Sequence, residues 1–204
     1  MAVGLGHNRL MGRPAPTARM TYAEYLAAEA VAEVRHEYLN GDVWAMAGGT
    51  IEHGALALAV AGELRSALRG KPCRAFPSDV RVRIPETGLS TYPDVTIVCG
   101  ELETAPEDKD AVTNPIVLVE VLSDSTEAYD RGAKAAHYRR IPSLREYVLV
   151  AQAEPRIEVQ RRSEGGRWEL LEARPGETIE LASLGVRLDV AAVYANPLDE
   201  AARR

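Results

Sequence analysis

The 204-residue sequence contains only two cysteines and no long hydrophobic run. None of its apolar stretches approaches the roughly 18 residues that a membrane-spanning helix needs. The N-terminal segment lacks the apolar core and small-residue cleavage site of a secretory signal. Cys73 and Cys99 form no CxxC pair, so we expect reduced, partly buried thiols rather than a disulfide. These absences predict a cytoplasmic protein that makes no contact with a membrane.

The sequence also lacks an excess of positive charge. Its 24 lysines and arginines are outnumbered by 30 aspartates and glutamates, which gives a formal net charge of −6. This balance argues against a protein that coats nucleic acid non-specifically. A local basic groove remains compatible with it, because residues 131–140 (RGAKAAHYRR) carry four basic side chains, a histidine and no acid.

Two helices are predicted in the first third of the chain. Thr21 and Glu24 form a capping box, and we expect the helix that they start to run to about Leu39. Asn40-Gly41 then predicts a tight turn, with a short strand paired back across it. Thr50 caps a second helix, for which we expect an apolar face of Ile51, Ala55, Leu58, Ala59, Leu64 and Leu68.

From residue 73 onward the pattern becomes that of β-strands. Residues 73–85 alternate between apolar and polar side chains, and 94–100 and 115–123 are denser, as in central strands. We expect a charged surface loop over residues 101–114, a helix over residues 125–138 and further strands after residue 145.

The order of these elements indicates one α+β (mixed α/β) domain, and the length suits a single domain. We expect a flexible N-terminal tail over residues 1–20, the domain over residues 21–197 and a C-terminal tail over residues 198–204.

Two carboxylates, Asp94 and Glu120, lie inside the most apolar segments. A carboxylate in a buried strand is normally paired, hydrogen-bonded or metal-bound. If the two strands are neighbours, both acids can share one face, where two charges about 4 Å apart repel by roughly 4 kcal/mol. A proton on one of them, or a cation such as Mg²⁺ or Mn²⁺, would relieve that repulsion. The alternative is that Asp94 caps a turn and Glu120 meets an arginine at a sheet edge.

The helix expected after the Glu120 strand carries Asp130, Lys134 and His137 on one face, at i, i+4 and i+7. Because only a short turn separates this helix from the strand, Lys134 could bring a positive charge to the two carboxylates. The alternative is a surface pair between Asp130 and Lys134, worth a few tenths of a kcal/mol.

Together these residues resemble a known pattern. The YPD that ends at Asp94, the VEVLS around Glu120 and the D, K and Y of the following helix are similar to the Uma-two family of inferred endonucleases. The resemblance extends to RHEYLNGDVWAMAGGTIEHGALA and IPSLREYVLVA, so that it covers about residues 21–160. It implies a restriction-endonuclease-like PD-(D/E)XK core, in which helices flank a central mixed sheet.

The resemblance also assigns roles. It makes Asp94 and Glu120 the catalytic, metal-binding carboxylates, with the main-chain carbonyl of Val121 as a third ligand of Mg²⁺ or Mn²⁺. Glu37, in the expected first helix, matches an acidic position that can complete the metal site. Its alternative role is that of a helix-surface or capping carboxylate beside Arg35.

The general nuclease pattern places a lysine two residues after the glutamate, where this chain has Leu122. The resemblance therefore assigns the catalytic ammonium group to Lys134. Candidate accessory residues are His53, Asp79, Asp130 and Tyr138, for which capping, turn formation, surface pairing and packing are the ordinary alternatives. Candidate phosphate contacts are Arg131, Arg139 and Arg140, which a solvated helix face explains as well.

The sequence thus predicts a metal-dependent endonuclease that hydrolyses phosphodiester bonds in DNA. Two alternatives remain: a weak or inactive nuclease-fold module that binds nucleic acid or a protein partner, and an interaction protein whose carboxylates are structural. A symmetric homodimer is the common default for the assembly.

Overall fold

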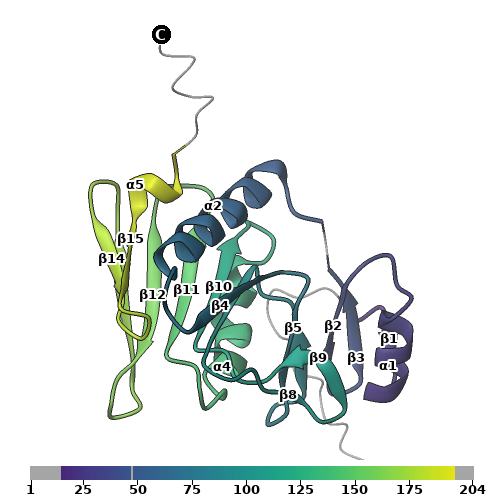
Figure 1. The fold of residues 1–204 in the computed structure, drawn as a ribbon. Helices are drawn as coiled ribbons and strands as arrows, with labels where there is room; N and C mark the ends of the chain where they lie inside the picture. The colour runs from purple at the N-terminus through teal and green to yellow at the C-terminus, as the bar shows by residue number, and fades with distance from the viewer. Residues whose placement is uncertain (1–14, 47, 196–204) are drawn as a thin grey trace, which may run out of the picture.

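The computed structural model describes residues 15–46 and 48–195 and contains two main β-sheets with helices beside them (Figure 1). The six-stranded sheet has the order β13 (Trp168–Ala173), β12 (Ile157–Arg162), β11 (Glu146–Ala151), β10 (Val117–Leu122), β7 (Val95–Cys99) and β4 (Cys73–Pro77). The seven-stranded sheet has the order β1 (Ala18–Arg19), β3 (Asp42–Ala45), β2 (His36–Leu39), β6 (Leu89–Thr91), β5 (Arg81–Ile84), β9 (Asp108–Val112) and β8 (Thr104–Ala105). A separate pair is formed by β14 (Thr178–Leu181) and β15 (Val186–Asp189).

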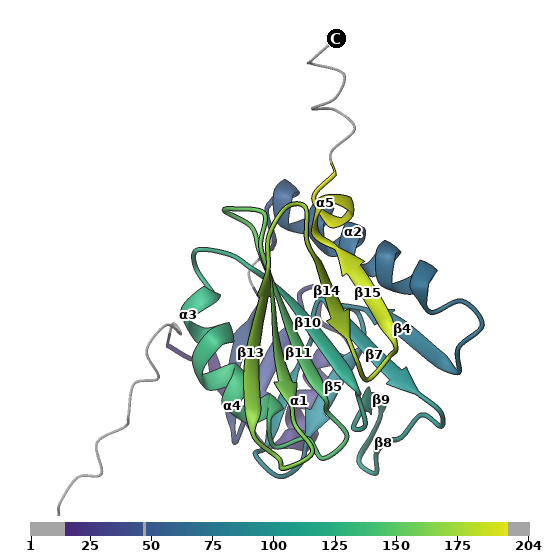
Figure 2. The ribbon, with the colours of Figure 1, turned by 90° about the vertical axis from the view of Figure 1, so that its left-hand side faces the viewer.

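Helices cover both faces of the six-stranded sheet, as Figures 1 and 2 show. The helical elements are α1 (Tyr22–Glu29), α2 (Ile51–Ala67), α3 (Glu127–Tyr129), the π-helical turn η1 (Asp130–Lys134), α4 (Ala135–Tyr138) and α5 (Val190–Val193). No helix in the described parts of the chain is long and apolar enough to cross a membrane. The observed architecture confirms the predicted mixed α+β class.

Strand β10 is buried on both sides, which explains its continuous apolar sequence. Val117, Val119 and Val121 belong to the apolar cluster that α2 shares with the sheet. Leu118 and Leu122 belong to a second cluster, with α4 and with β5 and β6 of the larger sheet. Glu120 lies between these two leucines in the alternation of β10 and so points to the same side of the sheet.

The first helix ends earlier than the sequence predicted. The capping box of Thr21 and Glu24 is present, and α1 stops at Glu29. Residues 36–39 instead form strand β2, which pairs antiparallel with β3 across the Asn40-Gly41 turn. Both turn residues have positive φ, 50° and 104°, as is typical of the tight turns that join two antiparallel strands. Glu37 therefore lies on a strand, and its placement in the first helix was wrong.

The second helix begins as predicted, because the Thr50 hydroxyl accepts a hydrogen bond from the His53 amide. Its apolar face was only partly predicted. Leu64 and Leu68 are buried, together with Val60, whereas the other predicted members point outward or lie at the margin of the face.

The region after residue 73 is divided between the two sheets. The alternating segment is two strands, since β4 belongs to the six-stranded sheet and β5 to the seven-stranded one. The expected loop over residues 101–114 contains β8 and β9. Its charges are explained in part by Asp108, which accepts two hydrogen bonds from the Arg81 guanidinium at 2.7 and 2.9 Å.

The ordered N-terminal part of the fold starts before residue 21. The Thr17 amide donates to the Val43 carbonyl at 2.7 Å, and the Met20 amide donates to the Gly41 carbonyl at 2.9 Å. Ala18–Arg19 thus form the short strand β1 beside β3, within the segment that was expected as a tail. The expected C-terminal tail lies outside the described residues.

The two cysteines are joined, contrary to the expectation of reduced thiols. Antiparallel pairing of β4 and β7 places Cys73 opposite Cys99, with 3.9 Å between their Cα atoms and a disulfide between their sulfur atoms. The spacing of the two cysteines does not indicate this pairing, because the partners come from different strands.

Candidate active site

Asp94 directly precedes β7 and is held against the neighbouring strand β10. The antiparallel register pairs Val95 with Val119, so Asp94 lies opposite Glu120. One carboxylate oxygen, Oδ2 of Asp94, accepts a hydrogen bond from the Val121 amide at 2.7 Å. The expectation that the two acidic strands are sheet neighbours is confirmed.

Glu120 is buried on the side of β10 that faces α4, and only 7 % of its side chain is exposed. Its Oε1 atom accepts a hydrogen bond from the Tyr138 hydroxyl at 2.6 Å. The same oxygen lies 2.9 Å from the ammonium nitrogen of Lys134. The helical segment after β10 therefore brings Lys134 to Glu120, as its spacing predicted.

Lys134 is surrounded by three carboxylates. Besides Glu120, its Nζ atom lies 3.2 Å from Asp130 Oδ1 and 3.5 Å from Glu37 Oε1. The surface pair that the sequence left open is thus a buried pair, because the π-helical turn η1 buries both Asp130 and Lys134. Single π-helical turns occur frequently at functional sites.

Glu37 reaches this cluster from β2, in the other sheet. The hydroxyl of Thr91, on the adjacent strand β6, donates a hydrogen bond to Glu37 Oε1. Sequence reasoning missed Thr91, as well as Tyr147, whose hydroxyl donates to the Asp130 carbonyl at 3.1 Å. Both sit in ordinary strand patterns, and only the tertiary structure shows where their hydroxyls point.

The electrostatics of the cluster follow from its burial. Loss of solvation raises the pKa of Glu120 to about 8, and the charges of Asp130 and Asp94 act in the same direction. Lys134 and the Tyr138 hydrogen bond oppose this rise. Burial alone would lower the pKa of Lys134, but Glu120 and the other acidic neighbours hold it well above its ordinary value. Lys134 therefore stays an ammonium ion, while Glu120 exchanges its proton near neutral pH.

His53 lies beside Asp94, in the first turn of α2. Its Nε2 atom is 3.4 Å from Asp94 Oδ2. A hydrogen bond with Asp94 raises the pKa of the His53 imidazole, and a hydrogen bond with the Val121 backbone acts in the same direction. The ring also packs closely on Gly49, where an added Cβ would lie 2.9 Å from Nδ1.

The other predicted residues lie outside this cluster. Asp79 is exposed in the turn after β4. Arg131 pairs with Glu127 at 2.7 Å and with Glu158. The remaining two arginines are also engaged: Arg139 donates to Gln160 at 2.7 Å, and Arg140 pairs with Glu86.

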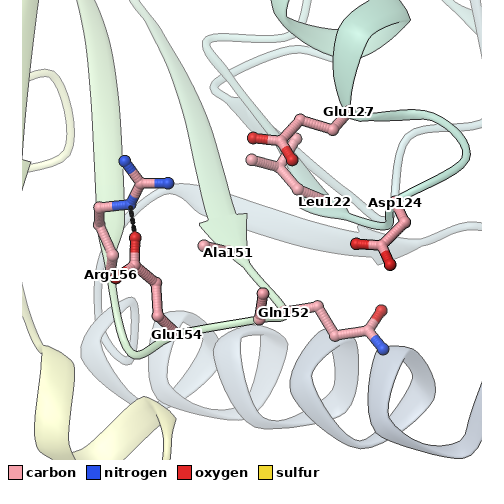
Figure 3. Close-up of a pocket in the computed structure, with 8 residues that line it drawn as sticks. Leu122, Asp124, Glu127, Ala151, Gln152, Glu154 and Arg156 are labelled. Carbon is pink, nitrogen blue, oxygen red and sulfur yellow. Dashed lines mark ion pairs between the residues drawn. The ribbon is translucent and has the colours of Figure 1, made fainter.

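A small pocket of about 270 Å³ opens at the ends of β10 and β11 (Figure 3). It is lined by Leu122, Asp124, Glu127, Ala151, Gln152, Ala153, Glu154 and Arg156. An ion pair of 3.1 Å joins Arg156 to Glu154. Because its charged lining is mostly acidic, this pocket is poorly suited to a phosphate.

The donor chemistry of the cluster suits a hard divalent cation. Asp94, Glu120 and the Val121 carbonyl provide only oxygen atoms, which Mg²⁺ and Mn²⁺ prefer. Among the described residues, no group of three or more His, Cys, Asp or Glu side chains could hold a metal ion. A Mg²⁺ ion typically takes one or two carboxylates and keeps several waters, so two carboxylates and one carbonyl would be enough protein ligands for it.

A comparison with models of protein families shows to which family the chain belongs. The model described as "Uma2: Putative restriction endonuclease" matches residues 22–191. The chain belongs to the Uma2 family. The match includes every residue of the cluster, and it confirms the resemblance seen in the sequence.

Two relatives match most of this chain. The uncharacterized protein slr1290 of Synechocystis sp. is 33 % identical over 183 residues, which are 88 % of this chain and 94 % of that protein. The uncharacterized protein sll1609 of the same organism is 34 % identical over 167 residues, which are 82 % and 94 % of the two chains.

The fold is shared with a solved structure. The crystal structure of "a putative nuclease belonging to DUF820" from Anabaena variabilis superposes with a TM-score of 0.70 at 17 % identity. The superposition covers 86 % of this chain and 97 % of that one. At this identity the similarity establishes the fold, which is the restriction-endonuclease-like fold that the sequence predicted.

Proposed function

We propose that this Uma2 protein is a Mg²⁺- or Mn²⁺-dependent endonuclease that hydrolyses phosphodiester bonds in DNA. The observation that carries the proposal is the ion pair between Lys134 and Glu120, on a strand whose next residue, Val121, donates its amide to the Asp94 carboxylate. Membership of the family described as "Putative restriction endonuclease", and the fold shared with a chain titled "a putative nuclease belonging to DUF820", support it.

The residues divide between metal binding and charge stabilisation. Asp94, Glu120 and the Val121 carbonyl would hold the cation, with Glu37 completing the set. A bound cation lowers the pKa of its water and neutralises charge on a phosphate. Lys134 would orient the attacking water or stabilise the charge that develops on the phosphate.

The helical position of Lys134 accounts for the departure from the general nuclease pattern. Leu122, which stands where that pattern has lysine, is buried in the apolar cluster with α4. The ammonium group arrives from η1 instead, within 2.9 Å of the same glutamate. Tyr138 would act as a positioning residue, because its hydroxyl donates to Glu120 Oε1. His53 would position Asp94 in the same way.

One observation favours the second candidate, a nuclease-fold module that binds without efficient cleavage. Glu37, Glu120 and Lys134 are all buried, so a phosphate could reach Lys134 only if the cluster opened. The arginines at 131, 139 and 140 are also engaged with Glu or Gln side chains. A binding module would show salt-sensitive affinity for DNA without turnover.

The test is incubation of supercoiled plasmid with the full chain in Mg²⁺, in Mn²⁺ and in chelator. We expect metal-dependent nicking by the unsubstituted protein and by Asp79→Asn, whose carboxylate is exposed outside the cluster. Asp94→Asn and Lys134→Ala should lose most of the activity. Equal cleavage by Asp94→Asn and Asp79→Asn would refute the assignment, and binding without cleavage would favour the second candidate.

The predicted cytoplasmic location stays a prediction. The disulfide between Cys73 and Cys99 removes the argument from reduced thiols on which that location partly rested.

A further inference from the structure

A second pocket, of about 290 Å³, lies at the N-terminal ends of the parallel strands β10 and β11. The pocket in Figure 3 opens at the other end of the same two strands. Ile116 and Arg145, which directly precede β10 and β11, line the second pocket together with Glu146, Arg161 and Arg162. Neighbouring side chains of a strand point to opposite faces, so a pocket lined by both Arg161 and Arg162 lies around the end of the sheet. We call it the arginine pocket.

Glu146, the one acid among the described residues that line the arginine pocket, is bound to partners inside the protein. Its side chain is only 1 % exposed. Oε1 accepts hydrogen bonds from the Arg161 guanidinium and the Ala182 amide, each at 2.9 Å. Oε2 accepts hydrogen bonds from the Ser183 amide at 3.2 Å and from the Ser183 hydroxyl. A carboxylate offers about four acceptor positions, so Glu146 has none left for another cation, and Arg161 neutralises its charge.

The other two arginines of the pocket have no acidic partner among the described residues. The Arg162 guanidinium donates to the Pro142 carbonyl at 3.0 Å and lies 5.7 Å from the centre of the Trp168 ring. Both of these partners are uncharged. The side chain of Arg145 is exposed, and no described residue forms a hydrogen bond or an ion pair with it.

The backbone holds Arg145 and Arg162 opposite each other. The Arg162 amide donates to the Arg145 carbonyl at 2.8 Å, which continues the antiparallel register of β11 and β12 by one position. Like charges at opposite positions of a strand pair are destabilising. The exposed acids Glu169 and Glu180 lie on β13 and β14 and do not line the pocket. Two positive charges therefore stand together without a counter-charge in the described parts of the chain.

We propose that the arginine pocket binds a phosphate dianion between the guanidinium groups of Arg145 and Arg162. The planar fork of a guanidinium group matches the oxygen atoms of a phosphate. Two unpaired positive charges also match the nearly two negative charges that a phosphomonoester carries at neutral pH. Ile116 and Ala182 in the lining offer an apolar surface to an organic group attached to the phosphate. The ligand is therefore a small phosphate compound, either inorganic phosphate or a phosphomonoester.

This pocket is separate from the candidate active site. Glu120 follows Ile116 by four residues, which is about 13 Å along an extended strand. A phosphate in the arginine pocket is therefore not the one that the proposed nuclease would attack, and the inference does not rest on the proposed function.

The test is calorimetric titration of the full chain with inorganic phosphate, with adenosine monophosphate and with adenosine, in chelator and at constant ionic strength. We expect saturable binding of the two phosphate compounds and none of adenosine. Arg145→Gln should raise the dissociation constant at least tenfold. The matched control is Arg65→Gln, because Arg65 is exposed on α2 and does not line the pocket. Tighter binding of adenosine monophosphate than of inorganic phosphate would identify a phosphomonoester as the ligand, and equal binding would identify inorganic phosphate.

Charge reversal gives a second readout. Arg145→Glu replaces two like charges with opposite charges, so we expect it to raise the melting temperature of the ligand-free protein. Phosphate should raise the melting temperature of the unsubstituted protein and leave that of Arg145→Glu unchanged. The proposal would be overturned if neither phosphate compound bound with saturation, if Arg145→Gln and Arg65→Gln bound phosphate equally, or if phosphate stabilised Arg145→Glu as much as the unsubstituted protein. All these measurements are made without metal or nucleic acid, so failure of this proposal and failure of the nuclease proposal are distinguishable.

Discussion

At the scale of single residues, burial makes the ionisation of Glu120 unusual. Its carboxyl group is buried, with acidic neighbours on two sides and one ammonium group at 2.9 Å. The pKa of about 8 means that, without a metal ion, the group carries a proton over part of the neutral range. A divalent cation would displace that proton, because carboxylate ligands bind metals in their ionised form.

This ionisation makes stability depend on pH. The pKa of Glu120 rises from an ordinary 4.5 to about 8 in the folded chain, so the folded state keeps a proton that the unfolded state releases. The resulting stabilisation is complete below the ordinary pKa and is lost as pH rises through about 8. In metal-free solution, we expect the free energy of unfolding to fall between about pH 5 and pH 8.5, relative to Glu120→Gln. Urea denaturation at several pH values measures it; a constant difference between the two proteins would contradict the assignment.

Lys134 supplies the positive charge for three buried carboxylates. Replacing it by methionine leaves Glu37, Glu120 and Asp130 without that charge. We expect Lys134→Met to lower the free energy of unfolding by about 3 kcal/mol in chelator, and Mn²⁺ to restore part of the loss. The control is Lys71→Met, because Lys71 is exposed and its replacement should change stability by less than about 0.5 kcal/mol. Equal stability of the two variants would show that the buried ammonium group does not stabilise the folded chain.

At the scale of secondary structure elements, the sequence predicted where helices begin and where the chain turns. It predicted less well where a helix ends and which face of a helix is buried. The caps at Thr21 and Thr50 and the turn at Asn40-Gly41 are local signals, and all three are present. The position of Glu37 was predicted wrongly because the segment before the turn has no local signal that separates a helix from a strand. Pairing with β3 and β6 decides it.

The face of α2 shows a second limit of local reasoning. Its aliphatic residues occur on both sides of the helix, so that periodicity alone could not tell which side meets the sheet. The disulfide and the approach of Thr91 to Glu37 were unpredictable for a related reason, because each joins segments that only sheet topology brings together. The contact between Lys134 and Glu120 was predictable, since strand and helix follow each other closely.

The N-terminal cap of α2 links that helix to the candidate site. The Thr50 hydroxyl accepts hydrogen bonds from the His53 amide and the Gln152 side chain, each at 3.1 Å. We expect Thr50→Ala to lower the free energy of unfolding by about 1 kcal/mol. Thr50→Ser keeps the hydroxyl group and should lower it much less. Denaturant unfolding compares the variants. If both substitutions cost the same, the hydroxyl group is not the stabilising feature.

At the scale of the whole molecule, the two acids of the site depend on how β4, β7 and β10 are held together. The disulfide ties the outer strand β4 to β7, which begins next to Asp94, and closes a chain segment between positions 26 residues apart. Such a link stabilises a fold chiefly by restricting the unfolded chain.

Reduction of the disulfide should therefore destabilise the protein. We expect a reductant, or Cys73→Ser with Cys99→Ser, to lower the free energy of unfolding by about 3 kcal/mol. Urea denaturation with and without reductant measures the effect. The serine variant is the control, because the reductant should not change its stability; an unchanged unsubstituted protein would count against a disulfide in solution.

The central claim is that Asp94 and Glu120 form a divalent-metal site, and calorimetric titration with Mn²⁺ tests it most directly. At pH 8 we expect the unsubstituted protein and Asp79→Asn to bind Mn²⁺ with the same affinity, and Asp94→Asn to bind at least tenfold more weakly. Equal binding by all three proteins, or no binding by any of them, would contradict the claim and leave the two acids with a structural role.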